Sequence, residues 1–134
     1  MSYFWAFLIS FSLLLFPFSP VEALPQGSKD RAELFATCSG RMEALAARHR
    51  GRKEDDAILV TDMQQEFDLM LQAVLPWALS DGVDEIQPAR WRVQGWVQVA
   101  YLLADIDYSL DAQITEGAKR QLHHRIAECR AVLL

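Results

Sequence analysis

Beyond Ser28, apolar side chains recur at steps of three and four residues, and no segment alternates between apolar and polar side chains. Steps of three and four place side chains on one face of an α-helix, whereas strict alternation is typical of a half-buried strand. Residues that end helices divide this pattern into four segments, at Gly51, at Pro76 and at the break 109–111. The sequence therefore predicts an all-α fold, most simply a four-helix bundle of up-down-up-down topology.

Each predicted helix has one apolar face that would be turned toward the core of the bundle. Acidic residues at 54–56 open the second helix, where the helix dipole favours them, and Pro88 opens the third. The predicted inward faces are Phe35, Cys38, Met42 and Leu45; Val60, Met63, Phe67, Met70 and Val74; Val93, Trp96, Val97, Ala100 and Ala104; and Ile114, Ala118, Leu122, Ile126, Cys129 and Leu133.

The first 23 residues have the pattern of a signal peptide. Residues 3–16 carry no charge, and the small side chains of Val21 and Ala23 suit signal peptidase. The uncharged run is too short to cross a bilayer core of about 30 Å. We expect cleavage after Ala23, which leaves one domain of residues 24–134, periplasmic or secreted and without a stable membrane anchor. Because no Lys or Arg precedes the run, a buried N-terminal helix and an uncleaved anchor stay open as alternatives.

The charge distribution separates the second predicted helix from the others. The formal net charge of the chain is −5, and this mild acidic balance implies no attraction to nucleic acid or to anionic membranes. Residues 54–89 nevertheless contain nine acidic residues and no Lys or Arg. This acidic stretch is either a solvated helix face or a docking surface for a basic partner or a weakly held divalent cation.

The two cysteines are predicted to form a disulfide. Cys38 and Cys129 lie on the inward faces of the first and fourth helices, which are antiparallel neighbours in the predicted bundle. At about 1.5 Å of rise per residue, their levels differ by two turns or less. Export to an oxidising compartment favours a bridge over the alternative of two buried free thiols. Closing so long a loop would stabilise the fold by about 4–5 kcal/mol.

Two short motifs surround these cysteines, FATCSGR at 35–41 and AECRAVLL at 127–134. Together they resemble a group of uncharacterised small exported helical proteins of alphaproteobacteria. The resemblance implies a helical domain with paired cysteines, and it implies nothing about activity.

No motif in the sequence predicts catalysis or a bound metal or cofactor. His49, His123 and His124 are not spaced as metal ligands, and the haem-attachment pattern Cys-x-x-Cys-His is absent. No serine lies in a Gly-x-Ser-x-Gly turn. We therefore expect a protein that is not an enzyme and has no cofactor. A carrier of non-covalent haem, held by Met42 and His123, or of a small apolar ligand is the alternative.

The third predicted helix is the best candidate for a partner surface, because residues 93–104 carry no charge. If Val93 and Ala100 mark its inward face, Trp91 and Leu102 point away from the core. A helix that is apolar on both sides is surrounded or covered. The connection 76–88 could fold over that side, the first helix could be shifted, or the inward face could be rotated.

The remaining interpretation is that a protein partner or a second copy covers this side of the third helix. Trp77, in the connection before it, could extend such a surface. The sequence thus predicts an exported interaction or structural protein, with Trp91, Leu102 and Trp77 as the candidate partner contacts.

Overall fold

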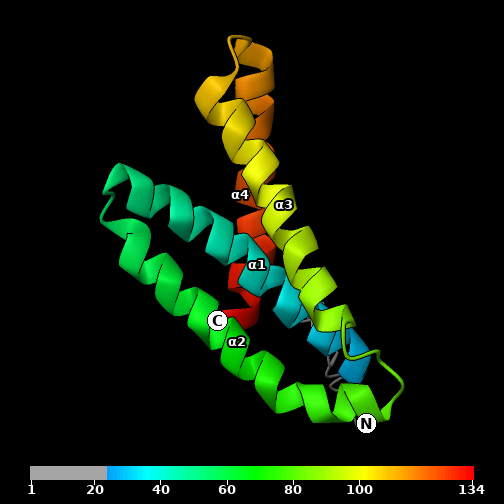
Figure 1. Cartoon of the computed structure of the whole chain (residues 1–134). Helices are drawn as coiled ribbons and strands as arrows, with labels where there is room; N and C mark the ends of the chain where they lie inside the picture. The colour runs from blue at the N-terminus through cyan, green and yellow to red at the C-terminus, as the bar shows by residue number, and fades with distance from the viewer. Residues whose placement is uncertain (1–23) are drawn as a thin grey trace, which may run out of the picture.

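The computed structural model describes residues 24–134, so the predicted signal peptide lies outside the described residues. The chain forms four helices, α1 (Ser28–Arg52), α2 (Asp56–Ser80), α3 (Gln87–Tyr108) and α4 (Ala112–Leu133), each antiparallel to the one before it (Figure 1). Residues 24–134 contain no strand, and the predicted all-α bundle is confirmed. None of these four helices combines the length and the apolar character that crossing a bilayer requires.

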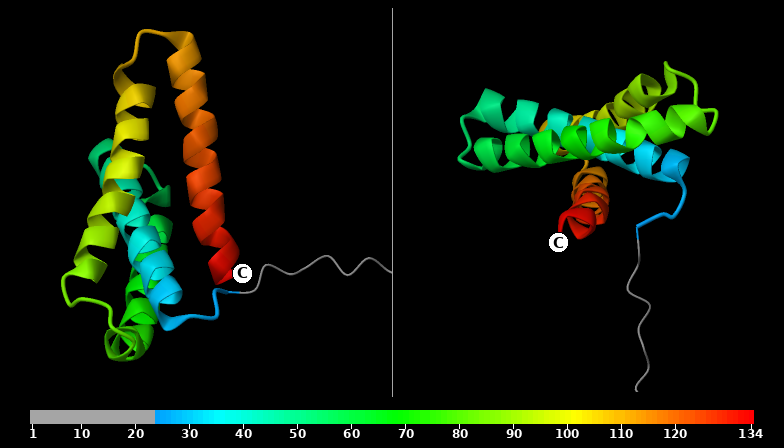
Figure 2. Two further views of the ribbon diagram at one scale, coloured as in Figure 1. Left: turned by 90° about the vertical axis from the view of Figure 1, so that its right-hand side faces the viewer. Right: turned by 90° about the horizontal axis from the view of Figure 1, so that it is seen from below.

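Helix α1 is the centre of the fold. Helix α2 packs along one side of α1, α3 packs along another, and α4 packs mainly on α3 with a small contact to α1. Figure 2 shows α1, α2 and α3 as one layer, with α4 lying against its underside. In this part of the chain the backbone of α2 does not approach that of α3 or α4. The bundle is therefore organised around α1, and the four helices do not contribute equally to its core.

Two glycines, Gly40 on α1 and Gly95 on α3, explain why α3 can pack closely on α1. A Cβ atom added at Gly40 would lie 1.9 Å from the carbonyl oxygen of Arg92, and one added at Gly95 would lie 2.1 Å from the carbonyl oxygen of Thr37. The backbones of α1 and α3 are thus in direct contact where they cross. Only glycine allows this approach on either helix.

Two predicted helix ends are wrong. Helix α1 passes through Gly51 and ends at Arg52. The next residue, Lys53, is left-handed at φ 56° and donates its N–H to the carbonyl of Arg50, while the N–H of Glu54 donates to the carbonyl of His49. Helix α2 passes through Pro76, and Figure 1 shows it bending near that end. A proline removes one backbone hydrogen bond. The helix continues to Ser80 nevertheless, because this last turn places Ala78 in the core.

The predicted inward face of α3 is also wrong, and the helix is rotated. The residues buried on α3 are Pro88, Trp91, Gly95, Val99 and Leu103. Trp91 is only 4% exposed, whereas Val93 is 61% and Trp96 43% exposed. The side of the helix that carries Gly95 can approach the α1 backbone most closely, so this side faces α1 and the opposite side faces outward.

Candidate functional site

The predicted disulfide between Cys38 and Cys129 is confirmed. It joins α1 to the end of α4 with a Cα–Cα distance of 5.6 Å. Both cysteines are completely buried, so the bridge is part of the core. It lies where α1 and α4 otherwise contact each other little, and it is the covalent link between them.

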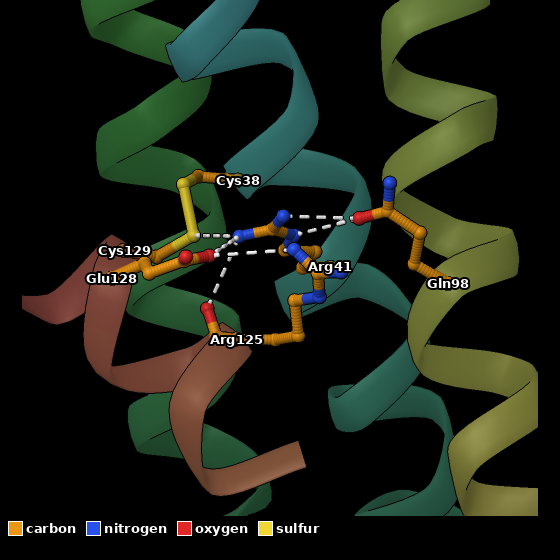
Figure 3. The surroundings of a disulfide bond; sticks show 6 residues. All are labelled: Cys38, Arg41, Gln98, Arg125, Glu128 and Cys129. Carbon is orange, nitrogen blue, oxygen red and sulfur yellow. Dashed lines mark hydrogen bonds and ion pairs between the residues drawn. A yellow bond between two sulfur atoms is a disulfide. The ribbon is translucent and has the colours of Figure 1, made fainter. Parts of the chain in front are cut away.

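A buried arginine lies beside the disulfide (Figure 3). Arg41 donates from Nη1 to Glu128 Oε2 at 2.8 Å and to the carbonyl oxygen of Arg125 at 3.2 Å, both on α4. Its Nε and Nη2 donate to Gln98 Oε1 on α3 at 3.1 and 3.0 Å. Burial lowers the pKa of the Arg41 guanidinium from its usual value, and the hydrogen bond and charge of Glu128 oppose that effect.

The Arg41 network is a structural junction of three helices. Each guanidinium nitrogen of Arg41 already donates a hydrogen bond to Gln98, Glu128 or Arg125. The group therefore holds α3 and α4 in place on α1. Sequence reasoning missed this residue, because it assigns charged side chains to the surface; its position three residues after a bridged cysteine is the signal that could have placed it.

A second polar cluster connects α2 and α3 across the small residues of α1. Asp68 Oδ1 accepts hydrogen bonds from Ser39 Oγ at 2.5 Å and from Arg92 Nη1 at 2.8 Å. Arg92 also donates from Nε to Glu43 Oε2 at 3.0 Å. One carboxylate of the acidic stretch 54–89 is thereby paired with an arginine at a half-buried position between helices.

The rest of the acidic stretch behaves as a solvated face. Glu54 lies against Arg48 and His49, and its pKa is lowered, chiefly by the hydrogen bond with His49. The other acids are exposed: Asp55, Asp56, Asp62, Glu66, Asp81, Asp84 and Glu85. Among residues 24–134, no three His, Cys, Asp or Glu side chains are grouped so that they could hold a metal ion.

A third ion-pair cluster fixes the far end of α3. Asp107 accepts two hydrogen bonds from Arg48, at 2.7 and 3.0 Å, and lies 2.8 Å from Arg52 Nη2. The hydrogen bond from Arg48 is the main cause that lowers the pKa of Asp107 below its ordinary value. The cluster attaches the end of α1 to the end of α3 and so fixes the rotation of α3.

This rotation leaves one apolar side of α3 exposed, and we name it the α3 outer face. Val93, Trp96 and Tyr101 are 61%, 43% and 71% exposed. The face lies opposite the residues that pack on α1, and no charged residue occurs anywhere from 93 to 104. The α3 outer face consists of Val93, Trp96, Val97, Ala100, Tyr101 and Ala104.

The three predicted partner contacts do not form one surface. Trp91 is buried against the cleft that contains Asp81, and Leu102 is half-buried between α3 and α4. Trp77 is 70% exposed, but it lies on α2 beside Phe35 of α1. Val93 and Trp96, which were expected from the sequence to face inward, are exposed instead.

A cleft of about 670 Å³ opens between the start of α1 and the end of α4. It exists because α4 diverges from α1, as Figure 2 shows. Its apolar lining residues are Leu24, Pro25, Leu34, Ala131 and Val132, and the charged residues at the same cleft are Asp30, Glu33, Arg41, Arg125 and Glu128. A volume of a few hundred Å³ is typical of small-molecule sites.

The two residues considered as haem ligands lie elsewhere. Met42 is fully buried in the core, and His123 is exposed. Neither of them lines the cleft between α1 and α4. The described residues thus do not bring this pair together as axial ligands.

Comparison with protein families, with curated proteins and with solved structures finds no match to this chain. Its function must therefore be inferred from the geometry of these surfaces.

Proposed function

We propose that this chain is a small exported interaction protein that binds another protein surface through the α3 outer face. The observation that carries the proposal is the exposure of Val93, Trp96 and Tyr101 on a stretch of α3, residues 93–104, that carries no charge. Side chains of this kind, aromatic and apolar in one contiguous area, are enriched at protein interfaces. A solvated helix of a monomer would carry charged residues there.

The size and chemistry of the face indicate what it binds. At their observed exposures, Val93, Trp96 and Tyr101 leave on the order of 300 Å² of side-chain surface in water. Patches of a few hundred Å² mark functional surfaces on soluble proteins. Because burying an unpaired charge is costly, the contacting surface of the partner is apolar and uncharged as well.

Two features support export. A disulfide persists in oxidising compartments, which lie outside the cytoplasm, and the Cys38–Cys129 bridge is completely buried. The uncharged N-terminal run with Val21 and Ala23 has the form that signal peptidase recognises. The exported protein should have the mass of a chain that begins at Leu24. A full-length species in the cytosol would contradict this part of the proposal.

The docking role is tested with a variant that adds charges to the face. Trp96→Asp combined with Tyr101→Asp should abolish the retention of periplasmic proteins on the immobilised chain, with little change in melting temperature. Ile58→Asp is the matched control, because Ile58 is an apolar residue of α2 that is 74% exposed. If the double variant and the control retain the same proteins as the unmodified chain, the α3 outer face is not the docking surface.

The cleft between α1 and α4 favours a second function, the carriage of a small ligand. Its volume of about 670 Å³ and its apolar wall at Leu34 and Val132 would suit an apolar molecule. Native mass spectrometry of the protein from its exported fraction should then show an additional bound mass. That mass should disappear in Val132→Trp, which fills the cleft, and persist in Ile58→Asp. A visible absorption scan separates haem from colourless ligands.

A further inference from the structure

We infer that the partner of the α3 outer face is a second copy of this chain, with the two α3 helices antiparallel about a twofold axis between Gln98 and Val99. The inference rests on the proposed docking function and specifies its partner. It follows from the order of side-chain sizes along the face, from the charges at its two ends and from its area.

The α3 outer face contains a seam of coiled-coil spacing. Val93, Val97, Ala100 and Ala104 follow one another at steps of four, three and four residues. This is the spacing at which one helix presents a continuous stripe to another. Large side chains occupy the first half of the seam and small ones the second half.

An antiparallel pair makes this asymmetric seam complementary to itself. With the axis midway along residues 93–104, Val93 of one copy meets Ala104 of the second copy, and Val97 meets Ala100. Every layer then contains one valine and one alanine, so the helices keep a constant separation. A parallel pair would place valine on valine and alanine on alanine, which leaves a gap at one end. A twofold arrangement is also the commonest symmetry of homodimers.

The charges at the two ends of the seam agree with the same arrangement. Arg90 precedes the uncharged run, Asp105 follows it, and both are exposed. At about 100° per residue, both lie on the Tyr101 side of the seam; Arg90 is next to the seam, and Asp105 lies further round, where it also lines a pocket with Ile114 of α4. A twofold axis perpendicular to the helices keeps each edge on its own side, so Arg90 of each copy approaches Asp105 of the other. The interface thus has no charge along its length and one pair of opposite charges at each end.

The area of the face predicts a weak dimer. Two such faces, with their flanking residues, bury on the order of 1,000 Å² in total, which is at the low end for specific interfaces. We therefore expect a dissociation constant in the micromolar range, with monomer and dimer exchanging at accessible protein concentrations.

The experiment exchanges the two central side chains. Sedimentation of the purified exported chain is measured from about 1 µM to about 1 mM, for the unmodified chain, Val97→Ala, Ala100→Val and the variant with both changes. Val97→Ala leaves two alanine–alanine layers and Ala100→Val creates two overfilled layers, so each should weaken the dimer at least about tenfold. The double variant restores one valine and one alanine in each layer, and should dimerise close to the unmodified level.

Two controls separate a loss of dimerisation from a general loss of apolar surface and from unfolding. Ile58→Ala removes exposed apolar surface on α2 and should leave dimerisation unchanged, and a melting curve for every variant shows that it folds. A chain that is monomeric at all concentrations, or a double variant weaker than either single one, would overturn the inference. The unmodified chain could be monomeric and still retain a periplasmic protein that the variant with both Trp96→Asp and Tyr101→Asp does not retain. In that case the docking function stands, and only the identity of its partner is different.

Discussion

The contact between α1 and α3 makes a sharp prediction for Gly40. An alanine Cβ there would lie 1.9 Å from the carbonyl oxygen of Arg92, 2.8 Å from its carbonyl carbon and 2.9 Å from the Trp96 nitrogen. All three neighbours are backbone atoms, so no side-chain rotation can relieve the overlap. Restoring an ordinary contact requires α1 and α3 to separate by about 1.5 Å along their crossing, which opens gaps around Trp91 and Val99.

The expected cost exceeds the intrinsic gain of alanine in a helix. Overpacking of a core costs roughly 1–3 kcal/mol and occasionally more, while alanine is better than glycine in a helix by about 0.5–1 kcal/mol. Because the obstacle here is rigid backbone on both sides, we expect Gly40→Ala to lower the free energy of unfolding by about 3 kcal/mol, at the upper end of that range. Gly95→Ala should behave similarly, since its Cβ would lie 2.1 Å from the Thr37 carbonyl oxygen.

Gly117 is the matched control. It lies inside α4, and the nearest atom to an added Cβ is Arg120 Nη2 at 3.9 Å. Gly117→Ala should therefore raise the free energy of unfolding by about 0.5–1 kcal/mol. Urea denaturation followed by circular dichroism, with the disulfide intact, measures all three variants. If Gly40→Ala is as stable as Gly117→Ala, the two helices do not cross with their backbones in contact.

Further substitutions test other features of the fold. Lys53→Gly should stabilise the protein by about 0.5–1 kcal/mol in thermal unfolding, because Lys53 has a φ of 56°; a loss of stability would contradict this helix end. Cys129→Ala should cost about 4 kcal/mol in denaturant unfolding, and an equal stability before and after reduction of the unmodified chain would contradict that estimate. Since the pKa of folded Asp107 is below its unfolded value, its stabilising effect is complete above the unfolded pKa and is lost as the pH falls through the folded one. Asp107→Asn should reduce the fall in the free energy of unfolding at acid pH. If the dependence on pH is unchanged, the ion pair between Arg48 and Asp107 contributes nothing to stability. Trp91→Gln should lower the melting temperature strongly and Trp96→Gln only slightly, since Trp91 is buried and Trp96 is 43% exposed; the reverse order would restore the rotation expected from the sequence.

The sequence predicted the elements of this fold better than their contacts. Helical spacing and helix-ending residues were sufficient for four helices. The predicted break at 109–111 precedes α4, where Asp111 accepts hydrogen bonds from the N–H groups of Gln113 and Ile114. The Cys38–Cys129 bridge was predictable because the chain has two cysteines, and both lie on the apolar faces of helices expected to be antiparallel neighbours. These inferences need only local patterns and the order of the helices.

The rotation of α3 could not be predicted in the same way. The inward face of a helix is predicted from its large apolar side chains. Val93 and Trp96 therefore defined the predicted face of α3, and Gly95, which has no side chain, did not contribute to the prediction. In the structure the absence of that side chain decides the contact, since backbone meets backbone at Gly95. Arg41 was missed for a related reason, because its partners Gln98 and Glu128 are far away in the sequence and only the tertiary fold brings them to it.

The position of the disulfide at the end of α4 has a consequence for local unfolding. Helix α4 has three buried residues, Ala118, Ile126 and Cys129, and its start projects with the end of α3 beyond the other helices (Figure 2). Amide hydrogen exchange reports the free energy of such local openings. Exchange should therefore be fast near Ala112 and become progressively slower toward Cys129. The disulfide holds this end of α4 on α1 while the other end opens. Reduction would remove that gradient and let α4 exchange as a separate unit, while α1 and α2 stay protected.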